Sequence, residues 1–293
     1  EEREEALAEK IRVYARRELY LDVAPYFSEQ VRRMLVKRYG ERQVVEGGLE
    51  VYTTLNVEYQ NYAQLAIDAG LGELDQRQGF RGPYAQLKEP AKRELFKEYY
   101  RGELGLLEKD KFEPVKGQVY LGLVTGFASR GQQVKLEVAG AKGILPLAGM
   151  RWARTPNPTV RWDIAYVSDA RRALKVGDLI AVELSSRKEL TRDDHGWEIA
   201  NTIPKRGTLY RLWQEPVAQA AIMSVDPETG YVVSQVGGYH FETSSFNRAV
   251  QACREPGSAF KPVVYSAAID KLDYTPSTLI DDKPLVYTDD NMR

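Results

Sequence analysis

A serine and a lysine three residues apart, Ser258 and Lys261, are the residues of this sequence best suited to chemistry. They follow Pro256 and Gly257, which favour a turn, and precede an apolar run from Val263, which favours a buried helix. Residues i and i+3 share one face of a helix, so the lysine amine would lie beside the serine hydroxyl. A neighbouring amine is one way to activate a serine nucleophile without a histidine.

The predicted helix begins close to this pair. Pro262 has no backbone N–H and is best tolerated in the first turn of a helix. Ser258 is therefore expected near the helix N-terminus, where free N–H groups and the helix dipole favour a developing negative charge. The competing interpretation is that Ser258 only caps the helix.

The same spacing occurs a second time, in Ser185 and Lys188. This copy lies in a highly charged stretch that ends in Asp193, Asp194 and His195. Clusters of charge between apolar segments are usually solvated, so this copy predicts a surface loop without a catalytic role.

A β-hairpin is expected just before the catalytic pair. Residues 218–225 and 231–236 are short apolar runs, and the sequence DPETG at 226–230 between them has the residues of a turn. The helix after Ser258 is expected to pack on this sheet through its apolar side chains, Val263, Val264, Ala267 and Ala268.

The middle of the chain, residues 73–206, predicts a small barrel or sandwich, because short alternating runs are separated by glycine and proline. A helix is expected over 84–100. The expected strands cover residues 117–125, 133–138, 142–147, 179–184 and 197–201. Four aromatic residues here could line a binding face or fill the barrel core, Trp152, Trp162, Tyr166 and Trp197.

The N-terminal part predicts helices and one strand. Exposed and amphipathic helices are expected over 1–17 and 26–39, the second with Phe27, Val31, Met34 and Leu35 near one face. The alternating residues 49–55 predict a strand. Asn56 is expected to cap a helix that runs from Val57 to about Ala69, where Gly70 and Gly72 end it.

The composition excludes several classes of protein. A chain of 293 residues with 43% hydrophobic and 28% charged residues is typical of globular proteins. The 41 basic and 42 acidic residues give a net charge of −1, which argues against nucleic acid as a partner. With one cysteine, Cys253, and two histidines, His195 and His240, nothing predicts a metal site, a cofactor or an internal disulfide. No apolar run approaches the roughly 18 residues of a membrane span.

Residues 237–262 (GGYHFETSSFNRAVQACREPGSAFKP) resemble the start of the transpeptidase domain of class A penicillin-binding proteins. Residues 47–56 (GGLEVYTTLN) resemble the segment that joins glycosyltransferase and transpeptidase in this family. Residues 74–83 and 150–154 resemble the inserted OB-like domain of the 1A type, and residues 275–287 also fit. The resemblance covers nearly the whole chain in order.

The resemblance implies an α+β chain of three parts. Residues 1–72 would be the helical and strand linker, and residues 73–206 the inserted OB-like β-barrel. Residues 207–293 would be the N-terminal part of a penicillin-binding, serine β-lactamase-like transpeptidase domain.

It also implies an activity. Ser258 would be the nucleophile and Lys261 its base, in the cross-linking of D-Ala-D-Ala stem peptides of peptidoglycan through an acyl-serine intermediate that β-lactams mimic. The parent protein would also polymerise glycan strands from a lipid-linked precursor. It would be held at the periplasmic face of the bacterial inner membrane by a single N-terminal anchor, which this chain does not contain, and a regulatory lipoprotein is a candidate partner of the OB-like domain.

The sequence departs from the family at two motifs. Ser-x-Asn and Lys-Thr/Ser-Gly are expected C-terminal to Ser258, and neither is found there. The similar spellings at 245–247 and 205–207 both precede Ser258 and are rejected. Because the second motif supplies half of the oxyanion hole, this chain by itself is expected to have little or no transpeptidase activity.

Three other functions stay open at this point. The chain could be a non-catalytic docking or regulatory module whose OB-like domain binds a protein. An OB-fold nucleic-acid binder would need a positive groove, which the balanced charge opposes. A free-standing β-lactamase fits poorly with the long segments that precede Ser258. His240 and Cys253 tempt a Ser-His or Cys-His reading, but no aspartate is placed to complete it.

Overall fold

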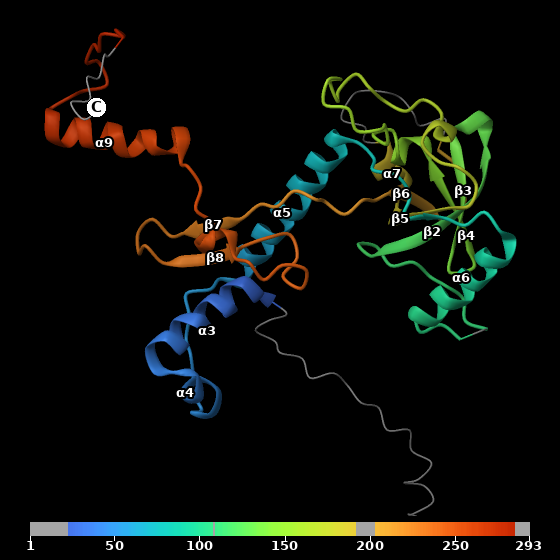
Figure 1. Ribbon diagram of the computed structural model, residues 1–293, viewed down its shortest axis with the longest axis horizontal. Coiled ribbons are helices and arrows are strands. Elements are labelled where there is room, and N and C mark those ends of the chain that lie inside the picture. Colours follow the sequence, from blue (N-terminus) through green and yellow to red (C-terminus); the bar gives the residue numbers. More distant parts are fainter. Residues whose placement is uncertain (1–22, 108, 192–202, 285–293) are drawn as a thin grey trace, which may run out of the picture. The chain divides into compact units, whose positions relative to one another are not determined.

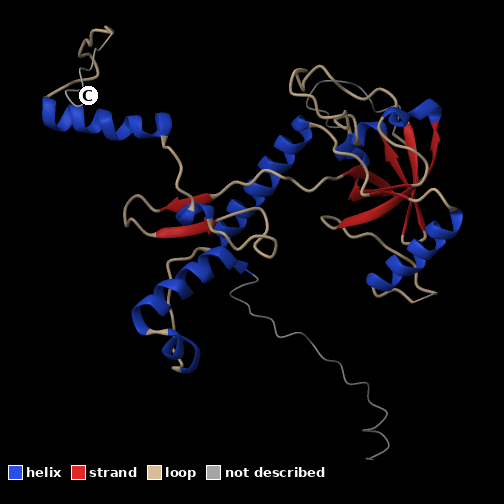
Figure 2. Cartoon of the chain, in the orientation of Figure 1, coloured by secondary structure: helices blue, strands red, loops and turns tan. Residues whose placement is uncertain are grey.

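The computed structural model describes residues 23–107, 109–191 and 203–284 (Figure 1). Contacts divide the chain into two compact units, Glu1–Val250 and Gln251–Arg293. The described residues contain both helices and strands, including a closed barrel, which confirms the α+β prediction (Figure 2). The predicted helix over 1–17 and the predicted strand over 197–201 lie outside the described residues.

Two short helices open the described chain. Helix α3 (Pro25–Tyr39) has Pro25 in its first turn and ends at Gly40, whose φ of 82° favours glycine. Helix α4 (Glu41–Glu46) follows directly. The predicted apolar face of α3 is only partly right, because Phe27 is buried whereas Met34 is exposed.

The predicted strand at 49–55 is wrong. The structure has no strand there, and Tyr52 is 91% exposed. The segment meets its neighbour at two points: the Thr54 hydroxyl donates to the Val232 carbonyl, and the Asn56 N–H donates to the Val233 carbonyl at 2.8 Å. Alternating residues favour a strand, but a ladder also needs a partner along its whole length.

Helix α5 (Val57–Gln78) begins as predicted and ends later. The Asn56 side chain accepts hydrogen bonds from the N–H groups of the first turn, which confirms it as the N-cap. The helix continues through Gly70 and Gly72 and ends at Gly79, whose φ is 101°. Leu71 and Asp75 are buried beyond the predicted end, so tertiary contacts outweigh the low helix propensity of glycine.

The predicted hairpin is confirmed. Strands β7 (Ile222–Val225) and β8 (Val232–Val236) pair antiparallel, with Ile222 opposite Val236. Within the turn, the Asp226 carboxylate accepts from the Glu228 N–H. Helix α5 packs on β8, and the buried Gln60 side chain exchanges two hydrogen bonds with the backbone of Gln235. The cluster between these elements consists of Tyr26, Ala63, Ile67, Leu71, Val236 and Tyr239.

Five strands close into a barrel in the order β5-β2-β3-β4-β6, with β6 paired back to β5; Figure 1 labels these strands. All pairs are antiparallel except β4 with β6. A two-residue strand, β1, adds to β5 at its edge. This is the five-stranded arrangement of an OB-fold. The bounds are β1 (Ala85–Gln86), β2 (Val119–Ala128), β3 (Gln133–Val138), β4 (Ala141–Pro146), β5 (Asp178–Ser185) and β6 (Leu209–Leu212).

Short helices complete the barrel and the C-terminal unit. Helix α6 (Pro90–Glu103) starts six residues later than the predicted helix, because residues 85–86 pair with β5 instead. The remaining helices are η1 (Ser129–Gly131), η2 (Leu147–Gly149), η3 (Ala170–Arg172), α7 (Arg187–Leu190), α8 (Arg248–Gln251), η5 (Gly257–Phe260) and α9 (Lys261–Leu272). None of the described helices is long and apolar enough to cross a membrane.

The barrel was predicted to end at residue 206, but strand β6 lies C-terminal to that position. Strand β6 pairs with β5 from Leu209 to Leu212. Its Tyr210 and Leu212 are buried in the barrel core, and burial raises the pKa of Tyr210 to about 12. We therefore propose that the barrel extends at least to Leu212.

Gly143 leaves room for the ring of Tyr210. A Cβ added to Gly143 would overlap the Tyr210 ring, which is 1% exposed and cannot swing aside. We expect Gly143→Ala to lower the free energy of unfolding by about 1–3 kcal/mol, measured by urea denaturation. Gly126→Ala is the matched control, because a Cβ there meets only the flexible end of Lys135 at 3.8 Å. Equal free energies of unfolding for Gly143→Ala and Gly126→Ala would contradict the role of Gly143 in leaving room for the Tyr210 ring.

One buried carboxylate ties the end of α5 to both connections of the barrel. Asp75 is 1% exposed and accepts from the Arg81 guanidinium at 2.5 Å, on the connection that leads into the barrel. It also accepts from the Gln214 amide, on the connection that leads out. Gln214 in turn accepts from the Arg81 N–H at 2.7 Å, and the Arg81 guanidinium donates to the Glu215 carbonyl.

Candidate functional site

The local backbone places Ser258 and Lys261 in one turn. Gly257, at a φ of 51°, opens the short 3-10 helix η5, and α9 follows from Lys261 with Pro262 in its first turn. The Lys261 N–H donates to the Ser258 carbonyl. In a 3-10 turn residues i and i+3 are eclipsed, so both side chains leave the backbone on the same side. The expected helix start is present, with Ser258 in the turn just before α9.

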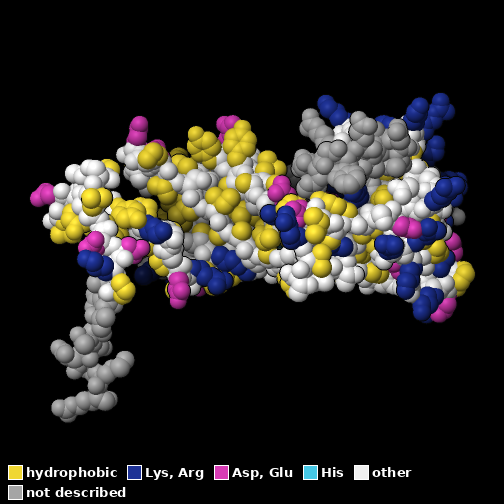
Figure 3. Space-filling view, turned by 90° about the horizontal axis from the view of Figure 1, so that it is seen from above, with side chains coloured by type: hydrophobic (Ala, Val, Ile, Leu, Met, Phe, Trp, Pro, Cys, Tyr) yellow, Lys and Arg dark blue, Asp and Glu magenta, His cyan; other side chains and the backbone are white. Residues whose placement is uncertain are grey.

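The surroundings of this pair are open. Ser258 and Lys261 are exposed, and no residue of α9 is buried. The packing of α9 on the hairpin through Val263, Val264, Ala267 and Ala268 stays a prediction, and within the C-terminal unit Val263 and Val264 are 56% and 50% exposed. Hydrophobic side chains exposed over the described chain appear in yellow in Figure 3. Within its own unit, the Lys261 side chain is therefore open to solvent.

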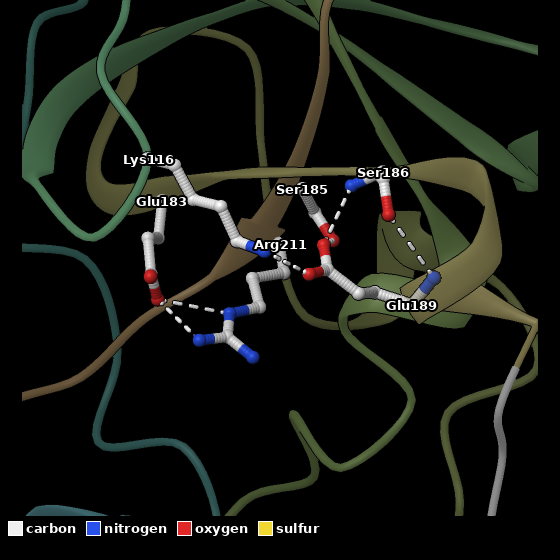
Figure 4. Close-up of polar contacts among 6 residues, drawn as sticks. All are labelled: Lys116, Glu183, Ser185, Ser186, Glu189 and Arg211. Carbon is white, nitrogen blue, oxygen red and sulfur yellow. Dashed lines mark hydrogen bonds and ion pairs between the residues drawn. The ribbon is translucent and has the colours of Figure 1, made fainter. Parts of the chain in front are cut away.

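The second copy of the motif is structural, but the predicted surface loop is wrong, because Ser185 ends β5 and Lys188 lies in α7. Ser185 is 9% exposed at the end of β5, and its hydroxyl donates to the Glu189 carboxylate at 3.3 Å (Figure 4). Ser186 and Glu189 form a capping box at the start of α7. The serine of this copy, Ser185, thus donates its hydroxyl to Glu189, the residue that completes the Ser186 cap.

Two ion pairs flank this cap (Figure 4). The Lys116 amine lies 2.6 Å from the Glu189 carboxylate, and together with the Ser186 N–H it holds the pKa of Glu189 down at about 2. The Arg211 guanidinium lies 2.6 Å from the Glu183 carboxylate across β5 and β6. These pairs join Lys116 to α7 and β6 to β5 at the barrel surface.

Other candidates near Ser258 in sequence have local roles or exposed positions. Asn247, part of the rejected Ser-x-Asn spelling, is 5% exposed and accepts from the Ala249 N–H. Arg248 donates to the Gly237 carbonyl and lies over the Phe246 ring, 5.5 Å from its centroid. Cys253 is a free, exposed thiol. Among the described residues no cluster of His, Cys, Asp and Glu could hold a metal ion.

Three of the four aromatic residues considered for a binding face lie together. Trp152, Trp162 and Tyr166 line one open cavity, whereas Trp197 lies outside the described residues. The cavity also takes Glu73, Gln76 and Arg77 from the C-terminal end of α5, and Arg154. No sequence pattern indicated that α5 and these aromatic residues line one cavity, because α5 was expected to end near residue 69.

Comparisons with known proteins identify both parts of the chain. Residues 80–218 match the family described as penicillin-binding protein OB-like domain, and residues 220–293 match the penicillin binding protein transpeptidase domain. The first match covers the barrel with β6, and the second covers the hairpin, η5 and α9.

Individual relatives are similar over most of this chain. Penicillin-binding protein 1A of Pseudomonas aeruginosa is 33% identical over 276 residues, 91% of this chain and 28% of the relative. Penicillin-binding protein 1A of Neisseria gonorrhoeae is 32% identical, over 97% of this chain and 31% of the relative. The chain thus spans under a third of the length of these relatives.

A solved structure has the same architecture. The crystal structure of penicillin-binding protein 1A from Haemophilus influenzae superposes with a TM-score of 0.63 at 26% identity. The superposition covers 99% of this chain and 36% of that one. With an OB-like barrel inserted between α5 and a hairpin that leads to the Ser258 turn, the chain belongs to the penicillin-binding proteins of type 1A, as a section with the OB-like domain and the start of the transpeptidase domain.

Proposed function

We propose that the protein to which these residues belong cross-links peptidoglycan by acyl transfer at Ser258. The observation that carries the proposal is the 3-10 turn that presents Ser258 and Lys261 on one side at the start of α9, inside the segment that matches the transpeptidase domain. A serine with a lysine beside it is a known way to make a nucleophile.

The proposed reaction has two steps. The Lys261 amine takes the Ser258 proton while the hydroxyl oxygen attacks the carbonyl between the two D-alanines, and the terminal D-alanine leaves with a proton. An amine of a neighbouring stem then attacks the acyl-serine, which forms the cross-link and frees Ser258. The Ser258 N–H would supply one donor of the oxyanion hole, at the positive end of α9. Serine β-lactam adducts would form by the first step alone.

Several properties of the whole protein belong to the same proposal. The parent would polymerise glycan strands from a lipid-linked precursor, trim stem peptides as a carboxypeptidase and help set cell shape. It would act at the periplasmic face of the inner membrane, held there by an N-terminal anchor. A regulatory lipoprotein at the OB-like domain stays a prediction.

The exposure of Ser258 supports the expectation that further residues complete the site. The test is the intact mass after benzylpenicillin, for the 293-residue chain and for a protein with the complete transpeptidase domain. We expect one penicilloyl adduct on Ser258 in the complete protein and none on the chain. An adduct on the chain alone would show that the site is already complete, and no adduct on the complete protein would refute the proposed function.

A further inference from the structure

An open cavity of about 270 Å³ lies where the end of α5 meets the loop between η2 and η3. Its volume is near the lower end of the range for small-molecule sites. Aromatic rings and polar side chains share its wall, as in sites where a few polar groups orient a ligand against apolar surface. None of its residues takes part in the chemistry proposed at Ser258.

The aromatic rings line the cavity and are held in place by contacts with neighbouring side chains. Trp162 is 42% exposed, although a tryptophan ring is costly to leave in water. The Arg77 guanidinium lies 5.7 Å from the centroid of that ring. Trp152 is braced edge-to-face by Phe80 at 6.0 Å. These contacts preorganise the rings, which lowers the entropy that a ligand would have to offset.

The polar wall contains a donor without an acceptor. Arg154 donates through one terminal nitrogen to the Arg77 carbonyl at 2.5 Å. Its other terminal nitrogen, Nη1, is buried and has no hydrogen-bond partner among the described residues. A buried guanidinium N–H that lacks an acceptor is unfavourable, because arginine stays charged. Arg154 lines the cavity, so a small rotation of its side chain would bring Nη1 to a ligand oxygen there.

The remaining polar groups restrict what the ligand can be. The Glu73 carboxylate accepts hydrogen bonds and the Gln76 amide both donates and accepts, beside the two arginines. Glu73 offsets one of the two arginine charges, so the wall does not select a strongly anionic ligand, and a purely apolar ligand would leave Arg154 unsatisfied. The ligand therefore has an apolar face for the rings and an edge of neutral donors and acceptors.

The geometry points to a saccharide site that binds one or two rings of a glycan made of N-acetylated amino sugars. The C–H face of a sugar ring covers an aromatic ring, while its hydroxyl and acetamide groups pair with Arg154, Glu73 and Gln76. OB-fold barrels are known to bind oligosaccharides. A peptide would instead use a strand edge or a long groove.

The test titrates the 293-residue chain with chitotetraose, the β-1,4-linked tetramer of N-acetylglucosamine, by calorimetry. We expect saturable binding that Trp162→Ala weakens about tenfold, equivalent to about 1.4 kcal/mol. Glu73→Gln is a second variant and should weaken binding by a smaller factor. Tyr99→Ala is the matched control, since Tyr99 is an aromatic residue 64% exposed on α6 and outside the cavity wall.

Three outcomes would overturn the inference. They are no saturable binding at millimolar chitotetraose, equal affinity of the wild type and Trp162→Ala, or binding of a stem-type pentapeptide at this cavity in place of the sugar. Circular dichroism confirms that each variant is folded. Acylation of the complete protein by benzylpenicillin is measured in parallel, so failure of the saccharide site is distinguishable from failure of the function proposed at Ser258.

Discussion

Replacing Ser258 by alanine in a protein with the complete transpeptidase domain is expected to reduce acylation by fluorescent penicillin on the order of a thousandfold or more. The reason is that in the proposed mechanism the acyl bond forms on the Ser258 oxygen, and no other group in the η5 turn can replace it. The rate of labelling, followed by gel fluorescence, measures the effect. Ser185→Ala is the matched control, because that serine belongs to the second copy of the spacing and its hydroxyl donates to Glu189.

Variants of Lys261 distinguish a catalytic base from a cation that acts only through its charge. Lys261→Ala should slow acylation by about 10²–10⁴-fold while the circular dichroism spectrum stays native. Lys261→Arg keeps the charge but cannot give up a proton near neutral pH, so it should not restore the rate. Lys188→Ala should leave the rate unchanged. Full activity of Lys261→Arg would show that the lysine acts only through its charge.

Removing the buried carboxylate of Asp75 is expected to cost about 3 kcal/mol of unfolding free energy. Asp75→Ala leaves the Arg81 and Gln214 donors without their acceptor, and hydrogen bonds to charged groups are among the stronger ones. Both connections of the barrel lose the same anchor. Urea denaturation gives the stability, and limited proteolysis at residues 213–221 reports whether the connection loosens.

Asp68→Ala is the control for this effect. Asp68 lies on the same helix and accepts only from Gln64 at 2.9 Å among the bonds described, in a half-buried position. It should cost less than about 1 kcal/mol. A double-mutant cycle between Asp75 and Arg81 should give a coupling of at least about 1 kcal/mol. Additive effects of the two substitutions would contradict the anchoring role of the pair.

Elements whose cause is local were predictable. Asn56 caps α5 because its side chain reaches N–H groups two and three residues ahead. The hairpin follows from the turn residues Asp226–Gly230 between two apolar runs, and the spacing of Ser258 and Lys261 required only a helical turn. The strands of the barrel were visible through their alternation, except for the short β6.

Elements that depend on contacts with residues distant in the sequence could not be predicted. Residues 49–55 alternate like a strand, but the hydrogen bonds to β8 come from Thr54 and from Asn56, at the end of the segment and just after it. Helix α5 passes through Gly70 and Gly72 because Asp75, buried by Arg81 and Gln214, lies beyond them. The extension of α5 also brings Arg77 to Trp162.

The sequence by itself determined the family and most elements of this protein and predicted the reactive pair, because motifs, caps and turns act over a few residues. Only the tertiary structure decided where the barrel closes and that a cavity joins α5 to the barrel loop. Strand pairing and burial join residues such as Glu73 and Trp162 that are far apart in sequence, and no local pattern records which of them meet.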